Sequence, residues 1–240
     1  MPICGRRLHE LGQPAFPGQG GQTVRIGVCL VSTDHVFAWH SYDLAGLLAF
    51  TVAARPDLDL RRFLATGCWL PELREKTTEA ALRAQCDALL YLDADMRFPV
   101  NALVRLLAHD TPVVAANYTT RRPPFHPVSV HSLGDPLTRV YTEQDSTGLE
   151  AVAATGMGVM LVQADLVRSV KPPRFMMGWV PDDHAHVGED LYFCKKLTDA
   201  GATIYVDHDL SKEVTHIGMV EFEAQHAVTS RQSAQTRAAF

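Results

Sequence analysis

The run Ala88-Leu89-Leu90-Tyr91-Leu92, followed by Asp93-Ala94-Asp95, decides the fold. An uninterrupted apolar run of this length is typical of a strand that is buried on both faces of a sheet. Two aspartates follow at the carboxyl end of this strand, which is where open α/β sheets place their ligands. Alternate side chains of an extended segment point to the same side, so the carboxylates of Asp93 and Asp95 can address one cation.

Strand-like and helix-like segments alternate on both sides of this run. The expected strands before and after it cover residues 25–32, 61–66 and 112–116. The expected helices cover residues 41–54, 71–85 and 99–108. This alternation indicates βαβ units and a parallel sheet.

The second half of the chain has a different character. Residues 117–145 form an irregular stretch with short alternating strands, and residues 171–187 are expected to form a long loop. The remaining expected elements are strands at 159–162 and 203–206 and helices at 164–170 and 189–200. We therefore predict an α/β fold with a mostly parallel central sheet flanked by helices and a smaller mixed or antiparallel portion. The predicted organisation is a flexible arm at 1–22, a single domain at 23–222 and a polar tail at 223–240.

Composition narrows the class of protein. The chain has 240 residues, of which 47% are hydrophobic and 20% charged, and its 22 basic and 27 acidic residues give a net charge of −5. This excludes collagen-like and disordered classes and an overall basic footprint for nucleic acid. The five cysteines are scattered without a CxxC pair, which argues against a structural zinc site and for a reducing compartment. The longest apolar run, 44–54, is far shorter than the roughly 20 residues of a membrane span. With no signal peptide expected, we predict a cytoplasmic protein.

Three Asp-x-Asp triplets occur, so the spacing alone decides nothing. Asp57 and Asp59 lie in a polar turn before a strand, where carboxylates are merely solvated. The triplet at Asp93 and Asp95 follows a buried strand at its carboxyl end, where open α/β sheets place ligands. The structural alternative for that triplet is a capped helix start before Pro99.

Four blocks, in order, resemble one family. Tyr91-Leu92-Asp93-Ala94-Asp95-Met96-Arg97-Phe98-Pro99 resembles the DxD segment of GT-A glycosyltransferases, especially the family 2-like group of bacteria and phages. Thr155-Gly156-Met157-Gly158 resembles the glycine-rich loop beside the donor sugar, and Gly188-Glu189-Asp190 resembles the xED motif that opens a helix. Thr215-His216-Ile217-Gly218 resembles the C-terminal histidine motif. The resemblance extends over residues 25–218.

The resemblance implies a hexosyltransferase that uses a nucleotide-sugar, with a UDP-sugar as the expected donor and Mn²⁺ or Mg²⁺ as the cofactor. It gives Asp95 the direct metal contact, Asp93 a share between ribose and metal, and His216 another ligand position. Asp190 is the expected catalytic base of an inverting reaction, beside Glu189, which orients the acceptor or caps the helix. In a retaining reaction Asp190 would not have this role.

Donor and acceptor contacts follow from the same resemblance. The implied donor-binding residues are Ser32, Thr33, Asp34, Arg74, Asp93, Ala94, Gly156, Met157 and Gly158. Arg74 departs from the pattern because Glu75 follows it where the family usually has asparagine, and a solvated helix arginine is the alternative. A tight turn is the alternative for the two glycines. The implied acceptor-side residues are Trp179, Asp182 and Asp183, in a loop that a solvated lid or a second metal cluster with His184 and His186 would also explain.

The acceptor itself stays open among a glycan, a lipid carrier, a small molecule and a hydroxymethylated base of phage DNA. A local basic surface for DNA phosphates is expected from Arg121, Arg122, Arg139, Lys171 and Arg174. The alternatives to a glycosyltransferase are a nucleotidyltransferase on a related fold and a catalytically inactive nucleotide-sugar-binding module.

Overall fold

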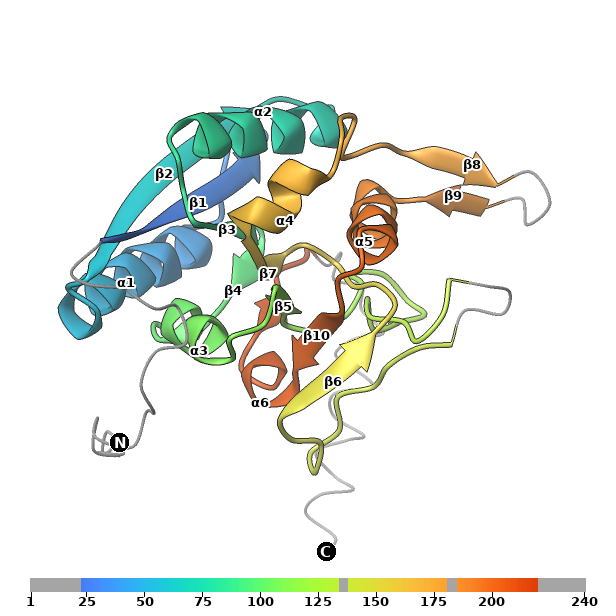
Figure 1. Ribbon diagram of the computed structural model, residues 1–240. Helices are drawn as coiled ribbons and strands as arrows, with labels where there is room; N and C mark the ends of the chain where they lie inside the picture. The colour runs from blue at the N-terminus through green and yellow to red at the C-terminus, as the bar shows by residue number, and fades with distance from the viewer. Residues whose placement is uncertain (1–22, 134–137, 181–184, 220–240) are drawn as a thin grey trace, which may run out of the picture.

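A computed structural model describes residues 23–133, 138–180 and 185–219. Its centre is a seven-stranded sheet in the order β2-β1-β3-β7-β5-β10-β6 (Figure 1). The strands are β1 (Val24–Ser32), β2 (Leu58–Thr66), β3 (Ala88–Asp93), β5 (Val113–Ala115), β6 (Leu149–Val152), β7 (Val159–Gln163) and β10 (Ile204–Asp207). The run 88–92 lies in β3, the third strand of this order, and its five residues are buried, as the sequence predicts.

The sheet is mixed, so the α/β class is confirmed but the mostly parallel sheet is not. β2 pairs with β1, β1 with β3 and β10 with β5 in parallel. β7 runs antiparallel to both β3 and β5, and β6 runs antiparallel to β10. The physical reason is that β7 is preceded by the irregular stretch after β5 and not by a crossover helix. That connection brings the chain back into the middle of the sheet in the opposite direction.

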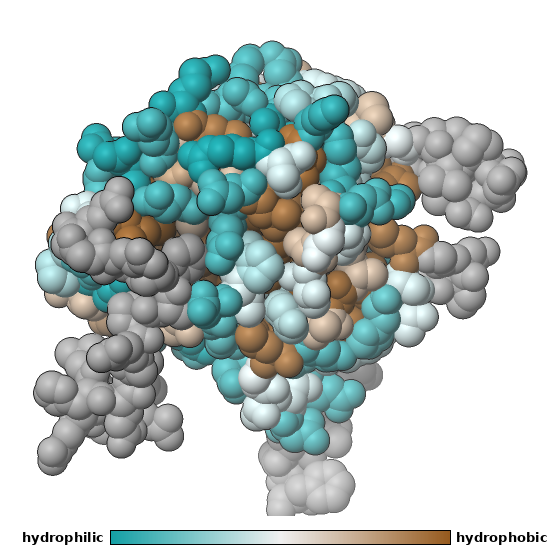
Figure 2. All heavy atoms as spheres, viewed as in Figure 1, coloured by the Kyte–Doolittle hydropathy of each residue, from teal (hydrophilic) through white to brown (hydrophobic). Residues whose placement is uncertain are grey.

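Helices cover both faces of the sheet. Their bounds are α1 (Ala38–Ala54), α2 (Leu70–Arg83), α3 (Ala102–Ala108), α4 (Ala164–Ser169), α5 (Glu189–Asp199) and α6 (His208–Ser211). One core cluster joins the sheet to α2, α4 and α5, and a second joins it to α1, α3 and α6. The outer surface of α2 is hydrophilic (Figure 2), as expected for a helix that buries one face only. In the described part of the chain, no helix has the length and apolar character needed to cross a membrane.

Two small sheets were not predicted. β4 (Met96–Arg97) pairs with β11 (Thr215–His216), and β8 (Gly178–Val180) pairs with β9 (Ala185–Val187). The second pair lies inside the segment expected to be a long loop and extends from the body of the molecule (Figure 1). The first pair carries residues of both the DxD and the histidine blocks, so it brings segments from the two halves of the chain together.

The register of β1, β2 and β3 defines the place of the site. Val31 of β1 lies opposite Asp93 of β3, and Ser32 lies opposite Thr66 of β2. The three parallel strands therefore end together, at what we call the carboxyl edge of the sheet. This is the edge at which α/β sheets bind ligands.

Candidate functional site

A buried arginine joins three elements at the carboxyl edge. Arg74 of α2 is 2% exposed. Its Nη2 donates to Asp93 Oδ1 at 2.9 Å, at the end of β3, and its Nε donates to Glu189 Oε1 at 3.0 Å, at the start of α5. The alternative of a solvated helix arginine is therefore wrong. A buried guanidinium is stable only when its charge is paired, so Arg74 fixes the relative positions of the two carboxylates.

One nitrogen of this guanidinium lacks a partner. Arg74 Nη1 is buried and has no hydrogen-bond partner among the described residues. Buried N–H groups are almost always satisfied in proteins. An unsatisfied donor beside Asp93 therefore marks a place where a ligand oxygen can bind.

Asp190 lies in the first turn of α5, next to this ion-pair cluster. Burial raises the pKa of its carboxyl to about 6, and the neighbouring charge of Glu189 adds to the increase. Its Oδ1 accepts a hydrogen bond from Leu191 N at 2.8 Å. A Cβ on the preceding Gly188 would lie 2.5 Å from the same Oδ1. Glycine at this position thus leaves room for the observed orientation of the Asp190 carboxylate.

Asp95 and His216 form a second group at this edge. The antiparallel pairing of β4 with β11, extended by a hydrogen bond from Ile217 N to Asp95 O at 2.7 Å, brings them together. His216 Nδ1 donates to Thr119 O at 2.8 Å, while His216 Nε2 lies 3.4 Å from Asp95 Oδ2. Arg121 Nη1 lies 2.6 Å from that same carboxylate oxygen.

The charges in this group shift its pKa values. Burial raises the pKa of Asp95, but the hydrogen bond and charge of His216 and the charge of Arg121 outweigh it and hold the pKa below its ordinary value. Burial lowers the pKa of His216, but hydrogen bonding to Asp95 and Thr119 outweighs it and raises the pKa. Burial raises the pKa of Asp93 against the opposing charge of Arg74. Asp95 is therefore the more readily ionised of the two aspartates.

The donor set at Asp95 and His216 fits a divalent cation in part. A histidine that donates Nδ1–H to a backbone carbonyl presents Nε2 as a metal ligand, and carboxylates are ligands of Mg²⁺ and Mn²⁺. However, within residues 23–133, 138–180 and 185–219, no three His, Cys, Asp or Glu side chains form a group that can hold a metal ion. The predicted set of three is not assembled, because Asp93 is held by Arg74 instead.

Tyr118 explains the glycine-rich loop. Gly158 N donates to Tyr118 Oη at 3.0 Å, and the Tyr118 ring lies edge-on to His216 with centroids 5.2 Å apart. A Cβ on Gly156 would collide with Tyr118 Oη, and one on Gly158 would lie 2.9 Å from the same ring. Both glycines are buried. They are needed because a tyrosine packs on the loop, whatever else the loop binds.

The other predicted donor residues lie at or near the carboxyl edge with different degrees of access. Ser32 ends β1 and its Oγ donates to His35 O at 2.8 Å, while Thr33 and Asp34 after it are exposed. Ala94 is partly buried between the two aspartates. The Met157 side chain belongs to the hydrophobic core, so only its backbone can face a ligand.

The predicted acceptor side falls largely outside the described residues. Trp179 belongs to β8. Asp182, Asp183 and His184 lie outside the part of the chain that the structure describes. The lid or second metal cluster expected from these residues therefore stays a prediction.

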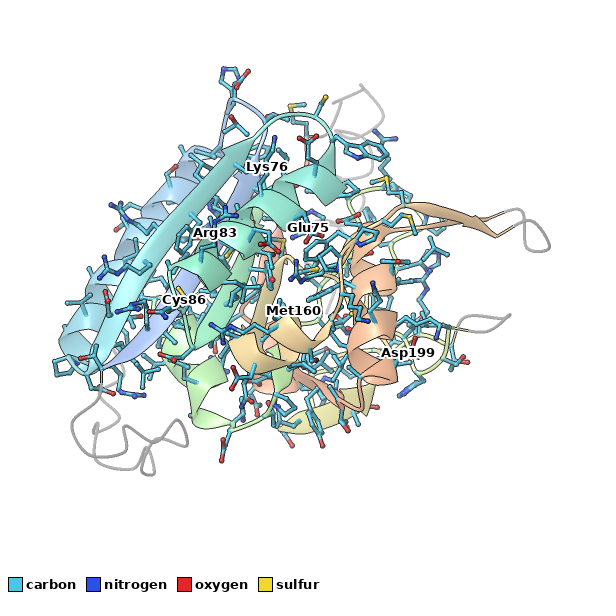
Figure 3. All side chains as sticks on the ribbon, turned by 45° about the horizontal axis from the view of Figure 1, so that its top comes forward. Glu75, Lys76, Arg83, Cys86, Met160 and Asp199 are labelled. Atoms are coloured by element: carbon cyan, nitrogen blue, oxygen red, sulfur yellow. The ribbon has the colours of Figure 1, made fainter. Side chains whose placement is uncertain are left out.

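The predicted basic surface is wrong for most of its members. Arg174 is buried and its Nη1 pairs with Glu75 and Glu79 of α2, of which Glu75 is labelled in Figure 3. Arg139 Nη1 donates to Pro127 O at 2.7 Å, and Arg121 is paired with Asp95. These three side chains satisfy groups of the protein itself, so they are not a surface for DNA phosphates.

Sequence reasoning missed the segment 118–121 as part of the site. Tyr118, Thr119 and Arg121 each contact His216 or Asp95. The three lie in the stretch expected to be irregular, and no local pattern marks them. Their role depends on contacts with β11, nearly a hundred residues later in the chain.

We expect Gly156→Ala to destabilise the protein by about 1–3 kcal/mol, the usual effect of overpacking, because the new methyl group displaces Tyr118. Gly178→Ala is the matched control, since a Cβ there has nothing within 4 Å. Urea unfolding of Gly156→Ala, of Gly178→Ala and of the double variant Gly156→Ala/Tyr118→Phe measures the free energy of unfolding. Equal stability of Gly156→Ala and wild type would contradict the packing of Tyr118 on this loop.

We expect Arg74→Leu to lower the free energy of unfolding by about 3–5 kcal/mol, because Asp93 and Glu189 lose their buried counter-charge. Arg83→Leu is the control on the same helix; Figure 3 labels Arg83 on α2, where its side chain is 72% exposed. The control should change stability little. Similar losses in the two variants would show that Arg74 does not hold the cluster together.

Comparisons with known proteins identify no family, and the solved structure described below is only weakly similar. Neither the protein-family models nor the curated proteins give a match. Among solved structures, the crystal structure of A197 from STIV is similar, with 13% sequence identity and a TM-score of 0.45 over 83% of this chain and 98% of that chain. At this level the likeness carries no argument about function.

Proposed function

We propose that the protein is a metal-assisted glycosyltransferase of GT-A type that moves a sugar from a nucleotide-diphosphate sugar, with a UDP-sugar as the proposed donor, to an acceptor hydroxyl. One observation carries the proposal. At the carboxyl edge, Arg74 holds a carboxylate of the DxD motif and the start of α5, and the start of α5 bears an aspartate of raised pKa. Glycosyl transfer needs both groups, one beside the departing diphosphate and one beside the incoming hydroxyl.

Asp190 is the proposed general base. A base works best when its pKa lies near the pH at which it acts, and a pKa of about 6 leaves the carboxylate ionised at neutral pH yet basic enough to accept a proton. Gly188 leaves the carboxylate free to face a substrate, and Glu189 beside it is already engaged by Arg74. This division assigns the chemistry to Asp190 and a positioning role to Glu189.

Asp95 and His216 are the proposed ligands of a divalent cation. A bound cation would supply positive charge that stabilises the departing diphosphate. His216 is oriented for this role by Thr119, and Asp95 stays ionised because its pKa is low. With two protein ligands, the remaining positions are left for water and for phosphate oxygens, which is the usual arrangement for Mg²⁺.

The donor would lie between these two groups along the carboxyl edge. Arg74 Nη1 is the buried donor available to an oxygen of the nucleotide-sugar. Ser32, which ends β1, and Thr33 and Asp34 after it are the proposed contacts of the nucleoside, a proposal supported by β1 and β3 ending together. A catalytically inactive binding module would use the same residues, so the test must separate chemistry from binding.

We expect Asp190→Asn to keep donor affinity while transfer falls by about 10²- to 10⁴-fold, the usual contribution of a positioned base. The amide keeps the size of the carboxylate but cannot accept a proton. Asp95→Asn should instead lose Mn²⁺ and donor affinity together. Turnover and calorimetric titration of the donor on the same preparations distinguish the two variants.

The pH profile gives an independent check on Asp190. Because its pKa is raised to about 6, the wild-type kcat/KM should fall as the pH is lowered through about 6, where the carboxylate becomes protonated. This limb should be absent from the residual activity of Asp190→Asn. Near wild-type transfer in a stable Asp190→Asn protein would remove this residue from the mechanism.

We expect Arg121→Gln to bind Mn²⁺ about two- to fivefold more tightly than wild type, because the guanidinium and the cation compete for Asp95 Oδ2. Arg122→Gln removes the same charge one residue away and should leave the affinity unchanged. Electron paramagnetic resonance of free Mn²⁺, with no nucleotide present, measures both. Identical affinities in the three proteins would show that Arg121 does not share this carboxylate with a cation.

A further inference from the structure

Two large aromatic side chains are exposed at the start of α1. Trp39 is 60% exposed and Tyr42 is 72% exposed. Their rings are nearly perpendicular, with centroids 6.2 Å apart, so they form one surface feature. Single exposed apolar residues are ordinary, but two aromatic residues in contact at the surface indicate a binding function.

The aromatic pair is held in place by a charged network. The Arg97 guanidinium carbon lies 4.6 Å from the centre of the Trp39 ring. Arg97 is itself fixed by Asp43 of α1, through Nε to Oδ2 at 2.8 Å and Nη2 to Oδ1 at 3.2 Å. A bidentate pair of this kind gives the guanidinium a defined plane. The Trp39 ring therefore packs against a guanidinium whose orientation is fixed.

The first turn of α1 is also attached to the chain beneath it. His40, between the two aromatic positions, is fully buried, and its Nδ1 donates to Met96 O at 2.9 Å. Its ring packs edge-on against Phe98, with centroids 5.6 Å apart. These contacts attach the helix start to β4, so the surface formed by Trp39 and Tyr42 is preorganised.

This attachment places the aromatic surface beside the candidate site. Met96 and Arg97 directly follow Asp95, and Met96 lies opposite His216 in the β4–β11 pair. The network that supports Trp39 thus contacts β4, which directly follows Asp95 and pairs with the strand that carries His216. A ligand on the aromatic surface would extend toward the carboxyl edge of the sheet.

The charges around the surface favour a neutral ligand. α1 contains no lysine or arginine, and the charge of Arg97 is paired with Asp43. A nucleic acid would need a row of unpaired cations along its phosphates. A pyranose ring is neutral, and it presents a face of C–H groups that stacks on an aromatic ring. Its hydroxyls can bond to Tyr42 Oη and to the partly exposed Arg97.

Resting on the proposed glycosyltransferase function, we propose that Trp39 and Tyr42 form a platform for a sugar ring of a neutral glycan acceptor. The platform lies outside the groups assigned to donor, cation and base. It therefore selects which acceptor is presented and takes no part in the chemical step.

The test is direct binding of neutral oligosaccharides, without nucleotide or Mn²⁺. Maltohexaose, cellohexaose, chitohexaose and mannohexaose are titrated into wild type, Trp39→Ala, Trp39→Phe, Tyr42→Ala and Trp69→Ala, with calorimetry and tryptophan fluorescence as readouts. Trp69 is the matched control, since it is 55% exposed but lies at the start of α2.

We expect at least one oligosaccharide to bind wild type and the Trp69→Ala control equally, and Trp39→Ala to lose at least about tenfold in affinity, as for loss of a stacking ring. Trp39→Phe should retain most of the affinity, and salt should have little effect.

Failure of all four oligosaccharides to bind, or equal binding by Trp39→Ala and wild type, overturns the platform. The platform is also overturned if wild type binds oligo(dT) with an affinity that weakens with salt. It is likewise overturned if wild type is a dimer that dissociates in the Trp39→Ala variant. Oligosaccharide binding that depends on Trp39, in a protein that binds no nucleotide-sugar, would retain the platform and reject the transferase.

Discussion

The buried charge of Arg74 is the constraint on which the rest of the site depends. One guanidinium pairs with Asp93 at the end of β3 and with Glu189 at the start of α5, two carboxylates that would otherwise repel each other in a poorly solvated place. The pairing couples α2, β3 and α5. Among the residues that the structure describes, no cation forms an ion pair with Asp190, and burial together with the charge of Glu189 raises its pKa. A structural ion pair thereby sets the basicity of the proposed catalytic residue.

The two aspartates of the DxD motif differ in their ion-pair partners. Asp93 is committed to Arg74, whereas Asp95 faces His216 and the half-exposed Arg121. A buried ion pair is difficult to break, while a partly exposed one exchanges readily. We therefore infer that Asp95 is the aspartate that accepts a cation and that Asp93 keeps the cluster together. Three of the four ordered motifs contribute charged or titratable groups to this edge, and the glycine-rich loop packs on Tyr118 beside His216.

The sequence predicts the first half of the fold well because its signals are local. The apolar run 88–92, the helix over most of α2 and the aspartates after β3 all follow from neighbouring residues. The antiparallel insertion of β7 does not, since an apolar run has the same pattern in either direction. The pairing of Arg74 with Glu189 spans 115 positions, and no local pattern reveals it. The same is true of Tyr118, whose ring explains two glycines that sequence reasoning assigned to a ligand.

The central claim is that one edge of this sheet binds a nucleoside diphosphate through a divalent cation. Isothermal titration of UDP into the protein, in Mn²⁺ and again in excess EDTA, tests it most directly. We expect binding at one site per chain in Mn²⁺ and no measurable binding in EDTA, because without the cation the charge of the diphosphate is not neutralised at this acidic edge. Equal binding in the two solutions, or no binding in either, would contradict it.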